Sequence, residues 1–294
     1  MLLHNYSNGG YKVELYDDGT KIRTKVSDVL PTFPEQMDLK ITDWCDGHCG
    51  WCHEDSLTTG KHGDVDAMLD LLRSLPPGVE IAIGGGDPLS HPDFPRFVRS
   101  LRSLGLVPSV TVNGKHYDRH AETLKELTSE GVLFGVGLSY AGKWPALDWD
   151  YPNKVVHLIA GVNHPTVALD IPAGQKVLIL GYKNFRRGSH LLVSEETARW
   201  VRSNINSWWW RLGEVARLHK LSFDNLAITQ LDPKRLFKDP ATYDEYYMGE
   251  EGNFSMYVDG VKQEFSLCSY EKTRYSWSDY SGISSMFQQI RTGK

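Results

Sequence analysis

Two hydrophobic rhythms alternate along the chain from residue 37 onward. Short apolar runs predict strands, and segments with apolar residues three and four positions apart predict helices. The predicted strands are 37–43, 79–86, 106–114, 132–140, 154–162 and 175–183. The predicted helices are 64–75, 93–105, 118–131 and 194–218, and a further strand is predicted over 221–229.

Strands that alternate with helices at this spacing pair in parallel through right-handed crossovers. Six such units predict an α/β fold, a partial (β/α)6 TIM-type barrel, whose functional residues lie at the carboxyl ends of the strands. Asp18-Gly19 and Asp259-Gly260 each predict the turn of a β-hairpin, one before and one after the barrel. The expected division is an N-terminal hairpin extension (1–36), the barrel (37–232) and a C-terminal extension that packs on the barrel (233–294).

The composition excludes several classes of protein. Hydrophobic residues make up 40% of the 294 positions and charged residues 23%, which is typical of a soluble globular protein. No apolar run approaches the roughly 20 residues that cross a bilayer, and the first ten residues lack the pattern of a signal peptide. We therefore expect a cytoplasmic protein without a membrane segment. A net charge of −5 argues against broad nucleic-acid binding.

Three of the four cysteines lie within eight residues, in the stretch ITDWCDGHCGWCHEDS (41–56). Cys45, Cys49 and Cys52 directly follow the first predicted barrel strand, a clustering that indicates a metal or redox centre rather than a disulfide framework. Three thiolates cannot close a tetrahedral structural site, which takes four ligands. Either His48 or His53 completes a zinc site, or the thiolates hold three irons of a [4Fe–4S] cluster and leave the fourth iron open.

The spacing Cys45-x-x-x-Cys49-x-x-Cys52 after a first strand resembles the signature of the radical S-adenosylmethionine (SAM) enzymes. The resemblance extends from residue 37 to about 190 and favours the cluster, since zinc fingers carry a second Cys-x-x-Cys pair that is missing here. It implies that SAM binds the open iron and is cleaved reductively to a 5′-deoxyadenosyl radical, which abstracts hydrogen from a substrate. It also implies a low-potential electron donor, flavodoxin or ferredoxin.

The same resemblance assigns residues to SAM. Trp51 stands where the family has an aromatic or apolar residue near the adenine, although a tryptophan here also suits simple packing of the loop. Gly85-Gly86-Asp87 stands for the family's Gly-Gly-Glu, whose backbone meets the methionyl amino group. Glycine permits a close approach of the ligand, and the aspartate departs from the family by shortening the carboxylate by one methylene.

Polar residues at the ends of later strands complete the predicted site. Asn113 and Ser139 fall where the family contacts the SAM ribose and carboxylate, although both residue types also suit strand ends. Lys183, Arg186 and Arg187 follow the sixth strand and form the densest basic patch near the expected mouth of the barrel. They suit either an anionic group of SAM or substrate, or a solvated loop.

The substrate is not readable from the residues. Cys268 stands alone, which predicts no auxiliary cluster, and 36 residues before the barrel are too few for a peptide-binding module. We therefore expect a small-molecule or nucleotide-like substrate, with a peptide-modifying maturase as the alternative. A non-catalytic iron–sulfur protein, whether electron carrier or sensor, and a zinc-binding protein are the rival classes.

Overall fold

The main sheet confirms the predicted parallel core. In the computed structural model, which describes residues 1–142, 144 and 149–293, ten strands join in the order β10-β9-β8-β7-β6-β5-β4-β11-β12-β13. The strands from β10 to β11 in this order are parallel to one another. Strand β12 is antiparallel to β11, and β13 is antiparallel to β12. Their bounds are β4 Gln36–Thr42, β5 Glu80–Gly85, β6 Val107–Asn113, β7 Gly135–Ser139, β8 Lys154–Ile159, β9 Lys176–Leu180, β10 Lys220–Phe223, β11 Ser255–Asp259, β12 Glu264–Ser266 and β13 Tyr275–Ser276.

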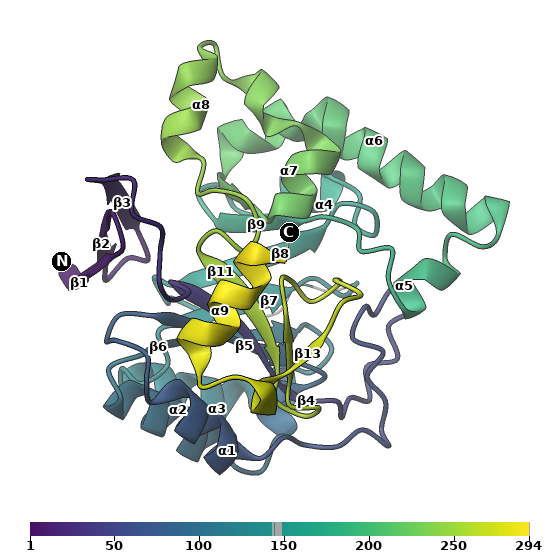
Figure 1. Cartoon of the computed structure of the whole chain (residues 1–294). Coiled ribbons are helices and arrows are strands. Elements are labelled where there is room, and N and C mark those ends of the chain that lie inside the picture. The colour runs from purple at the N-terminus through teal and green to yellow at the C-terminus, as the bar shows by residue number, and fades with distance from the viewer. Residues whose placement is uncertain (143, 145–148, 294) are drawn as a thin grey trace.

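Helices cover one face of this sheet in two groups (Figure 1). A first apolar core joins β4–β7 to α1 (Val65–Leu72), α2 (Phe94–Ser103), α3 (Tyr117–Ser129) and α9 (Ile283–Thr292). A second core joins β8 and β9 to α4 (Thr166–Leu169), α6 (Glu195–Leu218) and α7 (Asn225–Leu231). The short helix α5 (Arg187–His190) lies near the amino end of α6, and the short helix α8 (Pro240–Tyr246) follows α7 in the chain (Figure 1). None of the helices in the described part of the chain combines the length and apolarity needed to cross a membrane.

The opposite face of the sheet is the open inside of a partial barrel. Strand alternation buries residues such as Met37, Leu39 and Val112 against the helices and leaves the intervening residues on the inner face. Asp38 and Thr111 are exposed although they lie in the middle of central strands. The inner face is therefore polar and accessible, as a binding surface requires.

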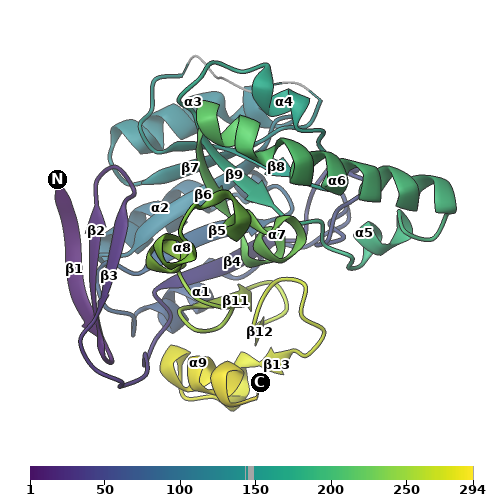
Figure 2. The same cartoon turned by 90° about the horizontal axis from the view of Figure 1, so that it is seen from above.

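The N-terminal segment departs from the predicted hairpin. It is a separate three-stranded antiparallel sheet of β1 (Leu2–Asn8), β2 (Tyr11–Tyr16) and β3 (Lys21–Lys25), so the strand 2–8 was not anticipated. This sheet lies at one end of the barrel strands, at the left of Figures 1 and 2. Lys21 of this sheet pairs with Glu80 at the start of β5, on the side away from the cysteines.

One further expectation needs correction. Residues 221–229 are not one strand, because Asp224 caps a helix by accepting a hydrogen bond from the Ala227 amide (2.7 Å), and α7 replaces the second half. The predicted C-terminal hairpin is present as β11 with β12. Beyond the prediction, β11 also pairs in parallel with β4 and extends the barrel sheet. The division at residues 36 and 232 stays a prediction.

Candidate metal centre

The three cysteines lie together on the loop that leaves the carboxyl end of β4. Cys45, Cys49 and Cys52 are half-buried and free of disulfides. The loop runs at the right of Figure 1, beside α5 and opposite the N-terminal sheet. Parallel barrel strands concentrate functional residues at this end.

Hydrogen-bond donors point at two of the sulfurs. The Gly47 amide lies 3.3 Å from Cys45 Sγ, and Asn113 Nδ2 lies 3.5 Å from Cys49 Sγ. Burial raises the pKa of both thiols, while Lys115 and Asn113 oppose this rise at Cys49. Donors and a nearby ammonium are partners that stabilise metal-bound thiolates.

These residues fit a cluster held by three thiolates. Three thiols on one loop, amide donors to sulfur and an adjacent cation make up the donor set that an iron–sulfur cluster uses. The zinc alternative requires a histidine as the fourth ligand. His53 instead lies 3.2 Å from Lys183 Nζ and 3.5 Å from Glu54, and His48 is exposed. In the described residues no group of three His, Cys, Asp or Glu side chains is placed to share a single metal ion.

The loop and its neighbour α5 contain unusual backbone. His48, Asp55 and Arg186 have φ values of 47°, 57° and 48°, in the left-handed region that side chains with a Cβ rarely adopt. Such conformations persist where the surroundings enforce them, and they gather at functional sites. Their presence in and against the cysteine loop marks it as a constrained site.

The predicted basic patch proves to be divided. Arg187 donates to the carbonyl oxygens of Cys49 (3.1 Å) and Ser56 (2.9 Å), and Arg186 donates to that of Glu54 (2.8 Å). Both arginines therefore hold the cysteine loop and are not a free patch for an anion.

Lys183 has different contacts from those of the two arginines. Its Nζ lies 2.9 Å from Ser269 Oγ and 3.2 Å from His53 Nε2, so it joins the end of β9, the cysteine loop and the C-terminal extension. The Lys183 side chain is half-buried. Desolvation inside the partial barrel raises the pKa of Asp38 on the inner face, and the positive charge of Lys183 opposes this rise.

A buried ionic network connects the cysteine loop to β4 and β11. The sequence analysis did not predict this network. Lys40 Nζ lies 3.0 Å from Glu54 and 3.3 Å from Asp259, with only 1% of its side chain exposed, and it also pairs with Asp43. Burial alone would lower the pKa of Lys40, but Glu54 and Asp259 raise it above its usual value. The sequence signal that could have revealed it is the lysine within the predicted strand MDLKITD. Lysine is rarely buried in a strand unless a carboxylate pairs with it, so this position predicts buried acidic partners.

The glycine turn packs against the start of the loop. The Gly86 and Asp87 amides donate to the carbonyl oxygens of Thr42 and Trp44, each at 2.8 Å. A Cβ at Gly86 would lie 2.1 Å from the Trp44 oxygen, and one at Gly85 would lie 2.4 Å from that of Thr42. The close approach at these two glycines is therefore made by the protein's own backbone. At Gly84 a Cβ would meet nothing within 4 Å, so the open position lies one residue earlier than predicted.

Asp87 is buried behind this turn. Its Oδ2 accepts a hydrogen bond from Ser90 (2.6 Å), lies 2.9 Å from His120 Nε2 and pairs with Arg119, while the buried Oδ1 has no partner among the described residues. Burial alone would raise the pKa of Asp87, but its hydrogen bonds with His120, Ser90 and Arg119 hold this pKa well below its usual range. Asp87 is therefore a carboxylate with one oxygen engaged.

The remaining predicted residues are brought to the same end of the barrel. Asn113 contacts Cys49 directly, as described above. Trp51 packs against an apolar cluster that includes Ile159 and Tyr182. Ser139 is half-buried at the end of β7, and its backbone carbonyl oxygen accepts a hydrogen bond from the Gly114 amide (2.9 Å), just after the neighbouring strand β6.

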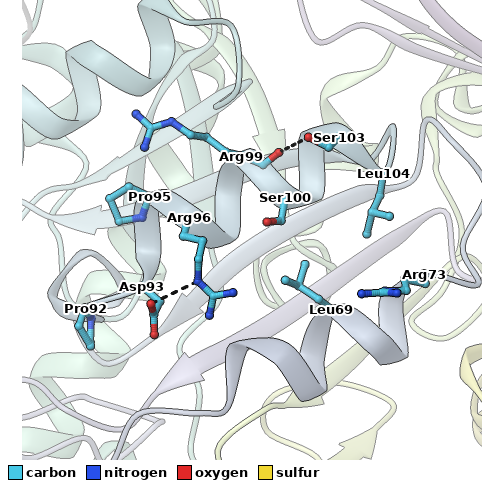
Figure 3. A pocket seen from close by; sticks show the side chains of 10 residues that line it. All are labelled: Leu69, Arg73, Pro92, Asp93, Pro95, Arg96, Arg99, Ser100, Ser103 and Leu104. Atoms are coloured by element: carbon cyan, nitrogen blue, oxygen red, sulfur yellow. Dashed lines mark hydrogen bonds and ion pairs between the residues drawn. The ribbon is translucent and has the colours of Figure 1, made fainter.

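A groove of about 800 Å³ lies elsewhere, on the outer surface between α1 and α2 (Figure 3). Its arginines are already paired: Arg96 with Asp66 and Asp93, Arg73 with Asp70, and Arg99 with Glu126 and Glu130. None of the residues that line the groove belongs to the cysteine loop, and its charged side chains among the described residues are all paired.

Comparison with known proteins finds a similarity that covers about a third of the chain. Residues 39–141 match the sequence model of the Radical SAM superfamily, whose members use a [4Fe–4S] cluster and SAM, the two predicted cofactors. The probable GTP 3′,8-cyclase of Methanothermobacter thermautotrophicus (strain Delta H) is 28% identical over 93 residues, which are 30% of this chain and 30% of that protein. The chain thus matches less than a third of the length of this curated relative.

Solved structures share the fold. SuiB of Streptococcus suis bound to SAM superposes with a TM-score of 0.55 at 12% identity, over 90% of this chain and 68% of SuiB. SuiB bound to its precursor peptide SuiA gives a TM-score of 0.49 at 12% identity, over 88% of this chain and 65% of that one. The matched sequence region begins in β4, contains the whole cysteine loop and ends just after β7, so this part of the chain is similar to the radical SAM superfamily.

Proposed function

We propose that this chain is a radical SAM enzyme in which Cys45, Cys49 and Cys52 bind a [4Fe–4S] cluster and leave one iron for SAM. The observation that carries the proposal is the gathering of three half-buried thiols on one loop at the carboxyl end of β4, against the Gly85–Asp87 turn. When bound, the cluster and SAM supply a 5′-deoxyadenosyl radical that abstracts a hydrogen atom from the substrate.

The residues around the sulfurs have a defined part in this proposal. The Gly47 amide and Asn113 donate to sulfur, and Lys115 and Arg187 bind carbonyl oxygens of the same loop. Hydrogen bonds to sulfur and nearby cations stabilise a more negative cluster and so tune its reduction potential. Flavodoxin or ferredoxin is the proposed source of the electron, and the cytoplasmic location stays a prediction.

The SAM contacts are proposed from the placement of the residues around the carboxyl ends of the barrel strands. Asp87 offers its unpartnered Oδ1 to the ammonium group of SAM, and Trp51 with Ile159 offers an apolar wall to the adenine. Asn113 and Ser139 end neighbouring strands and supply polar groups for the ribose and carboxylate. Lys183 offers a cation for an anionic group of SAM or substrate.

The proposed substrate is a small molecule or a nucleotide-like compound. The inner face of the sheet is polar at Asp38, Ser109 and Thr111, and the sequence relative is named for a reaction of GTP. A peptide is the second candidate, because SuiB, whose fold matches most of this chain, has been solved with a precursor peptide. Transfer of deuterium from a labelled candidate into 5′-deoxyadenosine decides between them.

The decisive experiment compares wild type with two variants after anaerobic reconstitution. We expect about four irons per wild-type chain and an iron–sulfur EPR signal after reduction, and neither in the Cys45→Ala/Cys49→Ala/Cys52→Ala protein. The reduced wild type should form 5′-deoxyadenosine from SAM, measured by chromatography.

Cys268→Ala is the matched control. This thiol is half-buried in the C-terminal extension, and burial together with Glu251 raises its pKa to about 12, so we expect no metal role. Cys268→Ala should keep its iron and its SAM cleavage. Equal iron in wild type and the triple variant would overturn the proposal, and so would S-adenosylhomocysteine as the sole product.

A further inference from the structure

The first turns of α3 contact both predicted binding segments at once. Arg119 and His120 lie on this helix, and His116 directly precedes it. Asp46, which His116 and Arg119 face, lies between two cysteines of the loop. Asp87, which Arg119 and His120 contact, ends the Gly85–Asp87 turn. One helix start therefore joins two segments that are about forty residues apart in sequence.

Arg119 makes the direct bridge. Its two terminal nitrogens donate to Asp46 Oδ2 (2.7 Å) and Oδ1 (2.8 Å), and Nη2 also donates to Asp87 Oδ2. The planar guanidinium can serve two carboxylates because its donors form a rigid fork, whereas a lysine presents one point charge. Asp87 is 1% exposed, so losing this partner would leave a buried carboxylate less well compensated.

The two oxygens of Asp87 differ in their surroundings. Ser90, Arg119 and His120 all engage Oδ2, while Oδ1 is buried without a partner among the described residues. A buried acceptor left unpaired is costly, which indicates that a ligand donor completes it. The engaged oxygen fixes the carboxylate, and the other is left without a donor among the described residues.

We propose that Arg119 is a positioning residue that locks the cysteine loop to the Gly85–Asp87 turn and holds Asp87 so that its Oδ1 receives the ammonium group of SAM. The inference rests on the proposed function, because it presumes that SAM binds here. It goes further by assigning the coupling between the two segments to one side chain.

The test measures SAM affinity of reconstituted Arg119→Gln and Arg119→Lys by equilibrium dialysis, together with iron content. Loss of a charge-assisted contact should weaken SAM binding about ten- to a hundredfold in Arg119→Gln, with a smaller loss in Arg119→Lys. Iron should stay near the wild-type value. The change that SAM causes in the EPR spectrum of the reduced cluster should require correspondingly more SAM.

A SAM analogue whose amino group is replaced by hydrogen separates positioning from simple stability. It should bind wild type and Arg119→Gln with the same affinity, because the group that Asp87 receives is missing. Likewise Asp87→Asn should weaken SAM binding, and adding Arg119→Gln should weaken it little further, since coupled residues are not additive.

Arg99 provides the matched control. It also bridges two carboxylates, Glu126 and Glu130, and 41% of its side chain is exposed against 38% for Arg119, but it lies on α2 in the remote groove (Figure 3). Arg99→Gln should keep wild-type SAM affinity. Equal SAM affinity in Arg119→Gln and Arg99→Gln, or loss of iron from both Arg119 variants, would overturn the inference. Failure of the proposed function would instead show in the wild type, as absent iron or absent SAM binding.

Discussion

His157 shows how burial at a single residue sets a pH response. It lies on β8 with its ring over Gly137, where a Cβ would come within 2.2 Å of the ring, and its Nδ1 has no partner among the described residues. Burial lowers the pKa of His157 to about 4. An exposed histidine in the unfolded chain has a pKa near 6.5. The folded protein therefore excludes a proton that the unfolded chain binds.

The sign of the effect follows from these two pKa values. Well above pH 6.5, His157 is neutral in both the folded and the unfolded state, so its protonation does not change the unfolding free energy. As the pH falls toward 4, the unfolded state gains a proton and the folded state loses relative stability. His157→Gln should therefore reduce the loss of unfolding free energy between about pH 7 and pH 4.5 by about 2 kcal/mol, measured by urea unfolding.

The exposed His164 is the control for this measurement. His164→Gln should leave the difference in unfolding free energy between the two pH values as it is in wild type. If His157→Gln loses as much stability as wild type on acidification, protonation of this residue does not contribute to acid sensitivity.

At the scale of elements, the backbone at the end of β5 packs closely against the backbone at the end of β4. The register of this pair shifts between Lys40 and Thr42, and Gly85 adopts a φ of 111°, which glycine alone accepts readily. This shift brings Gly86 against Trp44, the residue before Cys45. The turn therefore helps to set where the cysteine loop begins, whatever its role toward SAM.

Gly86→Ala tests this fit. The added methyl would lie 2.1 Å from the Trp44 oxygen, so backbone must shift, and we expect a loss of about 1–3 kcal/mol in unfolding free energy. Iron content after reconstitution should fall as well, because the displaced residue adjoins Cys45. Denaturant unfolding and iron analysis measure the two effects.

Gly84→Ala, two residues earlier, is the matched control. Its Cβ meets nothing within 4 Å, so the unfolding free energy should stay within about 1 kcal/mol of wild type. Equal stability of the two alanine variants would show that the turn accommodates a side chain and does not fix the loop.

At the scale of the whole molecule, the N-terminal sheet holds the amino ends of the barrel strands. Lys21 pairs with Glu80 at the start of β5, and Arg23 pairs with Glu35 just before β4 (2.7 Å). Near β8 and β9, Asn153 and Lys176 donate to backbone oxygens of the turn between β2 and β3. The sheet thus closes the barrel end opposite the cysteine loop, which leaves the cysteine end for ligands.

Arg23→Met tests the importance of this closure. Glu35 is fully buried, and Arg23 donates to both of its carboxylate oxygens while its Cζ lies 3.4 Å from the centre of the Phe254 ring. Removing one partner of a buried ion pair typically costs about 3–5 kcal/mol, and we expect a loss of that order in denaturant unfolding.

Lys25→Met supplies the comparison on the same strand. Lys25 and its partner Asp28 are both exposed, so its replacement should leave the unfolding transition unchanged. A transition for Arg23→Met that coincides with that of Lys25→Met would mean that the N-terminal sheet does not stabilise the barrel.

The sequence by itself predicted the parallel α/β core and the resemblance to the radical SAM superfamily, because both depend on local signals. Strand and helix rhythms repeat within a few residues, and Cys45, Cys49 and Cys52 share one loop whose spacing is visible along the chain. The strands 37–43 and 79–86 and the helix opened by Ser194 accordingly appear within a few residues of their predicted bounds.

Only the tertiary structure decided which side chains serve the loop. Arg186 and Arg187 read as a free basic patch, but folding brings them to carbonyl oxygens more than one hundred and thirty residues away. Arg119 carried no local signal at all, because its partners Asp46 and Asp87 lie on two other segments. The placement of β11 beside β4 was equally hidden, since pairing between distant strands is chosen by packing of the whole chain and not by its local pattern.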